Sequence, residues 1–131
     1  MFPDALTAAR GLLAERRWFE AHEALEVAWR AAEGPRRRWL QGLVQLAVSL
    51  EHLRRGNARS AQGQWEKSSR KLVDVPEILD GIAAAAWRDA CAHFFAAIAL
   101  SERASGESTI PVPDERDWPR PETVEEAAAT R

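Results

Sequence analysis

Apolar residues recur with the spacing of an α-helix along most of the chain, and glycine, proline and asparagine interrupt the pattern at intervals. The pattern predicts a first helix that starts near Pro3 or Asp4 and has residues 6, 9, 12 and 13 on one face. It predicts a second helix at 18–32 that stops at Gly34–Pro35, and a third at 36–55. A fourth helix, to about residue 72, would be capped by Asn57. After Val75–Pro76 we expect a final long helix ending near residue 104, with Gly81 leaving open whether its first turn is separate.

No segment shows the alternation of a β-strand between turn residues, so the predicted class is all-α. We expect a single compact bundle of about five helices in residues 1–104, followed by an irregular tail in residues 105–131. The tail contains four prolines and many carboxylates, and residues 110–113 are expected to lie extended over the helices. From residue 125 onward we expect a frayed end.

Length and composition agree with one globular domain, since the chain has 131 residues, 46% of them hydrophobic and 29% charged. Eighteen Lys and Arg against twenty Asp and Glu leave a formal charge of −2. A dedicated nucleic-acid binder needs an excess of cations, so no nucleic-acid partner is expected. The single cysteine, Cys91, cannot form an internal disulfide or a thiolate metal cage.

The sequence also bears on cellular location. Residues 1–4 lack the charged and apolar regions of a secretory signal. The best candidate for an uninterrupted apolar run is broken by Arg88 and Asp89, so no membrane-spanning helix is predicted. We therefore expect a cytoplasmic protein that does not associate with membranes.

The second predicted helix carries the first candidate functional residues. His22 and Glu26 are four residues apart, which lets their side chains reach each other on one helix face. That face is otherwise apolar, with Trp18, Phe19, Leu25 and Trp29 around them. A carboxylate between two tryptophans is unfavourable unless it is paired, hydrogen-bonded or protonated.

The third predicted helix has the complementary feature. It is apolar on two sides, which is typical of a central helix, and between those sides runs a stripe of Gln41, Gln45 and His52, broken only by Val48. If the two helices pack antiparallel, the polar groups of both meet inside the bundle. We therefore expect one semi-buried seam, formed by His22, Glu26, Gln41, Gln45 and His52.

Three functions remain open for this seam. It could be the pocket of a non-catalytic module that binds a small molecule or a protein partner. It could hold a divalent metal ion on His22, Glu26 and His52 in a hydrolase-like enzyme, with His22, Glu23 and Glu26 as catalytic candidates. It could also be a structural network in an oligomerising protein, in which tryptophans such as Trp65 or Trp118 bury in a homodimer contact.

Two segments resemble a known family, namely residues 18–30 with their aromatic-Glu-Ala-His-Glu core, and residues 40–47 followed by His52 and Arg55–Gly56–Asn57. The family is the group of small helical proteins known as domain of unknown function 309. The resemblance covers roughly residues 5–72, departs from the family pattern at residues 61–64, and implies an all-helical fold with no established activity. It maps the shared polar positions onto His22, Glu23, Glu26, Trp29, Gln41, Gln45, His52 and Asn57, and so adds Trp29 and Asn57 to the ligand-binding candidates.

Overall fold

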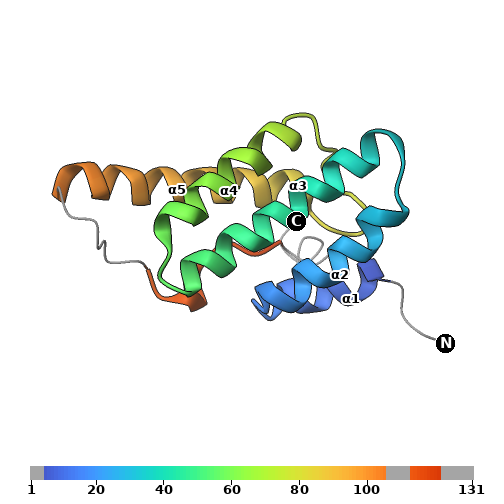
Figure 1. The fold of residues 1–131 in the computed structure, drawn as a ribbon, viewed down its shortest axis with the longest axis horizontal. Coiled ribbons are helices and arrows are strands. Elements are labelled where there is room, and N and C mark those ends of the chain that lie inside the picture. The colour runs from blue at the N-terminus through green and yellow to red at the C-terminus, as the bar shows by residue number, and fades with distance from the viewer. Residues whose placement is uncertain (1–4, 106–112, 122–131) are drawn as a thin grey trace, which may run out of the picture.

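The computed structural model of this chain describes residues 5–105 and 113–121, with side chains described through residue 100 and again from residue 113. Five helices follow one another: α1 (Ala5–Ala14), α2 (Trp18–Ala31), α3 (Gly34–Arg54), α4 (Ala58–Lys71) and α5 (Ala84–Ser105). A short 3₁₀ helix at Glu115–Asp117 comes after them (Figure 1). Within these ranges β pairing is limited to one isolated bridge, so the all-α class is confirmed.

The predicted breaks between the first four helices are confirmed. α3 begins at Gly34, whose φ of +63° is accessible to glycine without strain, and Pro35 occupies its first turn. Gly56, with a φ of +81°, follows α3. The Asn57 side chain then accepts a hydrogen bond from the Ser60 amide at 3.1 Å, which caps α4.

The prediction for the last helix was wrong at its start. α5 begins at Ala84 rather than near residue 75, and residues 73–83 form a loop. Asp80 and Gly81 both have positive φ values, which a right-handed helix cannot contain. Leu79 and Ile82 exchange two backbone hydrogen bonds of 2.9 Å across this turn. Both side chains are buried, so the core holds the turn in place.

Helices α1 to α4 pack as a series of neighbours, and α3 contacts both α2 and α4 (Figure 1). The prediction that α3 is central is confirmed, because ten of its residues are buried. α5 joins this core through an apolar stripe of Trp87, Cys91, Phe95 and Ile98. Burial raises the pKa of the Cys91 thiol far above its ordinary range, so the thiol stays protonated. None of the described helices is long and apolar enough to span a membrane.

The described part of the tail, residues 113–121, packs on the helices. Trp118 is only 4% exposed, and its indole N–H donates to the Pro113 carbonyl at 2.7 Å. Arg16 donates to the Trp118 carbonyl, and Trp87 donates to the Pro119 carbonyl. Trp118 is therefore buried by its own chain, and the expectation that it is exposed for a homodimer contact was wrong. Trp65 is half-buried and stacks on Phe95. Residues 110–112 and 125–131 lie outside the described residues.

Candidate functional site at the contact of α2 and α3

The buried stripe of α2 does not run through His22 and Glu26. It consists of Trp18, Ala21, Leu25 and Ala28. His22 and Glu26 lie beside this stripe and are half-buried. The two alanines explain the difference, because a small side chain lets a neighbouring helix approach closely and so moves the centre of the contact away from the bulkier residues. The prediction that His22 and Glu26 occupy the middle of the buried face was wrong.

The polar stripe of α3 is real, but it does not face a dry interior. Gln41, Gln45, Val48 and His52 are all half-buried, and their spacing of four, three and four residues puts them on one helix face. The residues between them are all buried. Within residues 41–52 the stripe is thus the side of α3 that keeps contact with solvent, and the five-residue seam does not form as a sealed network.

Glu26 and Gln45 each have a partner on a different helix from the other's. Glu26 pairs with Arg30 of the same helix, with 3.4 Å between the Arg30 Nη2 and the Glu26 Oε2. Gln45 accepts a hydrogen bond from Lys71 of α4 at 2.9 Å. Burial is the main cause that lowers the pKa of Lys71, and the nearby cations Lys67 and Arg70 add to it. Neither Glu26 nor Gln45 lines the hollow that contains the histidines.

The remaining candidates occupy separate places. Glu23 is exposed on α2, and Gln41 is half-buried at the other end of the α3 stripe from His52. Trp29 lies under the guanidinium of Arg37, whose central carbon is 4.9 Å from the ring centroid. Asn57 caps α4. None of these four residues lines the hollow that contains His22 and His52.

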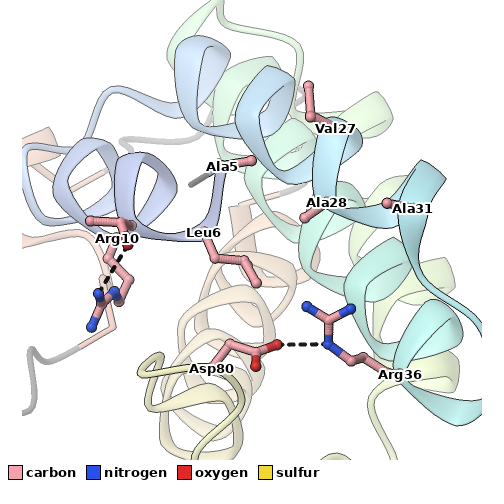
Figure 2. A pocket seen from close by; sticks show the side chains of 9 residues that line it. Ala5, Leu6, Arg10, Val27, Ala28, Ala31, Arg36 and Asp80 are labelled. Carbon is pink, nitrogen blue, oxygen red and sulfur yellow. Dashed lines mark hydrogen bonds and ion pairs between the residues drawn. The ribbon is translucent and has the colours of Figure 1, made fainter. Parts of the chain in front are cut away.

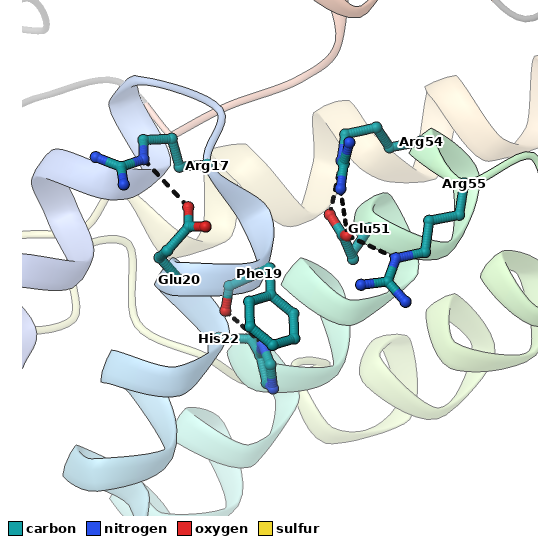
Figure 3. A network of polar contacts seen from close by, with 7 residues as sticks. All are labelled: Arg17, Phe19, Glu20, His22, Glu51, Arg54 and Arg55. Carbon is teal, nitrogen blue, oxygen red and sulfur yellow. Dashed lines mark hydrogen bonds and ion pairs between the residues drawn. The ribbon is translucent and has the colours of Figure 1, made fainter.

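His22 and His52 are brought together. Both line a small hollow of about 140 Å³ between α2 and α3, with Phe19, Val48, Glu51 and Arg55 as the other described lining residues. The His22 Nδ1 lies 2.5 Å from the Phe19 carbonyl oxygen (Figure 3). A carbonyl can only accept, so Nδ1 is the donor in this contact and the other ring nitrogen, Nε2, takes no part in it.

Glu51 is the site residue that the sequence interpretation missed. It is only 7% exposed, and its carboxylate accepts two hydrogen bonds from Arg54, at 2.7 and 2.9 Å, and one from Arg55, at 2.9 Å (Figure 3). The bond from Arg54, followed by that from Arg55, lowers the pKa of Glu51. Arg54 and Arg55 follow Glu51 by three and four residues, and side chains at these spacings are neighbours on a helix. The sequence alone therefore contained the information needed to predict this cluster.

A second hollow of about 340 Å³ adjoins the first, and Phe19 and Glu51 line both. Its other walls include Arg16 and Arg17 before α2, Arg54 on α3 and Glu115 of the tail. Phe19 is 42% exposed although it is a large apolar side chain. Its ring has the Arg55 guanidinium 5.8 Å from its centroid and the His22 ring in edge contact at 5.0 Å. An exposed aromatic held between cationic and imidazole groups is typical of a binding surface.

The expected metal site is not formed. Among the described residues, no group of three or more His, Cys, Asp and Glu side chains is placed to hold a metal ion. Glu26 is instead paired with Arg30, and Glu51, which does lie beside both histidines, is already bound by two guanidinium groups. The described residues therefore do not support the alternative in which His22, Glu26 and His52 share an ion.

Comparison with known proteins defines the extent of the family resemblance. Residues 6–64 match the model of a family described as a domain of unknown function, DUF309. Over 62 residues the chain is 44% identical to the uncharacterized protein YpuF of Bacillus subtilis (strain 168), an alignment that covers 45% of this chain and 34% of YpuF. The chain thus matches about a third of the length of that relative. No solved structure matches the chain.

The matched segment contains α1, α2, α3 and the first half of α4, and so includes Phe19, both pocket histidines and Glu51. The loop at residues 73–83, α5 and Trp118 lie beyond it. The resemblance drawn from the motifs around His22 and His52 is confirmed, since residues 6–64 match the DUF309 family model.

Proposed function

We propose that this protein is a non-catalytic binding module that takes a small anionic group, such as a carboxylate or phosphate, in the hollow lined by His22 and His52. The observation that carries the proposal is the convergence of two imidazoles and the Arg55 guanidinium, from two helices, around one exposed aromatic ring. The ligand could be a small molecule or an acidic group of a protein partner.

A guanidinium in the hollow supports an anion. Arg55 lines the hollow and shares the Glu51 carboxylate with Arg54. Arg55 gives Glu51 one of its five N–H groups, and the others are available to a second acceptor. His22 and His52 also line the hollow, and a ring N–H is a hydrogen-bond donor. Arg54 and Arg55 also lie at the end of α3, where the helix dipole favours cations.

The size of the hollow limits the ligand. Sites that enclose a drug-sized molecule have volumes of roughly 300–1,000 Å³. The hollow of about 140 Å³ is smaller, so it fits one functional group rather than a whole cofactor. A longer ligand could extend past Phe19 into the adjoining hollow of about 340 Å³.

The histidines allow a direct test. The chain has three, and His93 of α5 is an exposed residue outside the hollow. Imidazole signals are followed by NMR while sodium phosphate, and separately sodium acetate, replaces sodium chloride at constant pH and ionic strength. We expect the His22 and His52 signals to shift and saturate together, while the His93 signal serves as an internal reference.

Variants give the matched control. Arg55→Gln should weaken the response of His22 and His52 to either anion, whereas Arg30→Gln, which removes an exposed arginine of α2 outside the hollow, should not. Circular dichroism verifies that each variant is folded. If all three histidines respond alike, or if Arg55→Gln binds as well as the unchanged chain, the proposal is wrong.

A further inference from the structure

A third hollow, larger than the two beside Phe19, lies between α1, the second half of α2, the start of α3 and the loop at Asp80 (Figure 2). Its volume is about 530 Å³, within the range of roughly 300–1,000 Å³ typical of small-molecule sites. It shares no described lining residue with the two hollows beside Phe19. It is therefore a separate candidate site.

One side of this hollow is apolar. Leu6 of α1 and Val27, Ala28 and Ala31 of α2 line it, and Figure 2 shows these side chains on the two helices above Asp80 and Arg36. The alanines leave room where larger side chains would fill the space. Val27 is 57% exposed, so an apolar ligand would remove a large apolar side chain from water.

The opposite side is charged. Arg36 Nε donates to Asp80 Oδ2 at 2.9 Å, and Figure 2 shows the two terminal nitrogens of Arg36 turned away from Asp80. A carboxylate can accept from these two nitrogens without displacing Asp80. Arg10 also lines the hollow, and two guanidinium groups against one carboxylate leave an excess positive charge.

Arg10 is the second cation of this hollow. Its guanidinium lies directly against Gly81, since a Cβ built on that glycine would clash with the Arg10 Nη1. The Arg10 Nε is closed to solvent, so a ligand in the hollow would reach this arginine only through the rest of its side chain.

We propose that this hollow binds a small carboxylic acid with an apolar body, which lies against Leu6 and Val27 while its carboxylate binds the terminal nitrogens of Arg36. This site is independent of the one proposed for His22 and His52, and it joins the DUF309 segment to the loop at Asp80, which lies outside that segment.

Hexanoate is a suitable probe, and hexan-1-ol is a neutral control with the same number of carbon atoms. Methyl signals of Leu6 and Val27 are followed by NMR in the full chain, with the His22 and His52 imidazole signals recorded in the same samples. We expect hexanoate to shift the two methyl signals and to bind about tenfold more tightly than the alcohol, because charge-assisted hydrogen bonds to a guanidinium favour it. This comparison needs no variant.

A second experiment compares substitutions at two arginines of the run at residues 36–38. Arg36→Gln should reduce hexanoate affinity to that of the alcohol. Arg37→Gln, which removes an exposed arginine of the same run outside the hollow, should leave the affinity unchanged. Equal binding of acid and alcohol, methyl signals that do not move, or equal effects of the two substitutions would each overturn the proposal. The imidazole signals report separately on the other site, so the two proposals can fail independently.

Discussion

Two glycines within helices, Gly42 and Gly63, differ in how much space surrounds them. A Cβ built on Gly42 of α3 would lie 2.7 Å from the Leu72 Cγ, and Leu72 is fully buried. Ser68 of α4 donates to the Gly42 carbonyl at 2.7 Å at the same contact. Gly63 of α4, in contrast, has open space where its Cβ would be. The absence of a side chain at Gly42 therefore lets α3 and α4 approach each other.

We predict opposite effects of alanine at these two glycines. Gly63→Ala should stabilise the protein by up to about 1 kcal/mol, because alanine favours a helix more than glycine does. Gly42→Ala has the same helix preference but must displace Leu72 in a packed core, so it should destabilise by about 1 kcal/mol net. Urea unfolding of both variants measures the difference. Equal stabilisation by both would mean that the α3–α4 contact is not close at Gly42.

Glu51 predicts how stability depends on acidity. Its pKa is lower in the folded chain than in the unfolded chain, so its ion pairs contribute fully above about pH 4.3, the ordinary value of a glutamate. The contribution is lost as the pH falls through the folded-state pKa. Glu51→Gln should destabilise by about 1–2 kcal/mol at neutral pH, because the arginine partners are largely exposed.

Urea unfolding of the unchanged chain and of Glu51→Gln, from neutral pH to about pH 3, checks this sign. The difference in unfolding free energy between the unchanged chain and Glu51→Gln should become smaller as the pH falls. Glu26→Gln is the matched control, because its single pair with Arg30 is longer and more exposed, and its effect should be small at every pH. A gap for Glu51→Gln that widens in acid would contradict the prediction.

At the scale of elements, the arginines that open α3 fix that helix against the loop at residues 73–83. Arg36 pairs with Asp80, and Arg38 pairs with Asp74 at 2.8 Å. The Trp39 indole N–H also donates to Asp74 at 3.1 Å. The hydrogen bond from Arg38, followed by that from Trp39, lowers the pKa of Asp74 to about 2. The start of α3 thus holds the loop that completes the larger hollow.

Asn57 allows a prediction about a single element. Its side chain satisfies one of the free amides at the start of α4, so Asn57→Ala should destabilise the protein by about 1 kcal/mol. Asn57→Asp keeps an acceptor and should retain most of the stability. Thermal unfolding of the two variants measures the contribution of the cap, and an alanine variant as stable as the unchanged chain would contradict a capping role for Asn57.

For the whole molecule, the tail segment at residues 113–121 connects parts that are distant in sequence. Trp118 contacts Phe94 of α5, and its carbonyl accepts from Arg16 between α1 and α2. Glu115 of the same segment lines the hollow beside Phe19 and Glu51. The segment thus contributes both to the core and to a wall of the candidate site.

We predict that Trp118→Ala destabilises the protein by about 3 kcal/mol, which is the usual loss for a buried tryptophan. Trp65→Ala removes a half-buried ring of the same kind and should cost less. Urea unfolding gives both values, and light scattering under the same conditions records the oligomeric state. A Trp118→Ala variant as stable as the unchanged chain would show that the tail is not part of the cooperative fold.

The sequence by itself determined the class, the order of the helices and most of their ends. Helical periodicity reports which faces are apolar, and Gly34, Pro35, Gly56 and Asn57 interrupt the helix through their own backbone preferences. These effects are local, so they can be read without coordinates. The start of α5 was misplaced because Asp80, a non-glycine residue, adopts a positive φ in a turn that is anchored by the burial of Leu79 and Ile82.

Only the tertiary structure decided which polar residues share a site. Periodicity gives directions around each helix separately, but it does not give the rotation at which two helices meet. For α2, the small residues Ala21 and Ala28 set that rotation. In the resulting arrangement Glu26 pairs with Arg30 and Gln45 bonds to Lys71. His22 and His52 line one hollow. The burial of Glu51 and Trp118 likewise depends on contacts between segments far apart in the chain, and such contacts follow from packing rather than from local sequence.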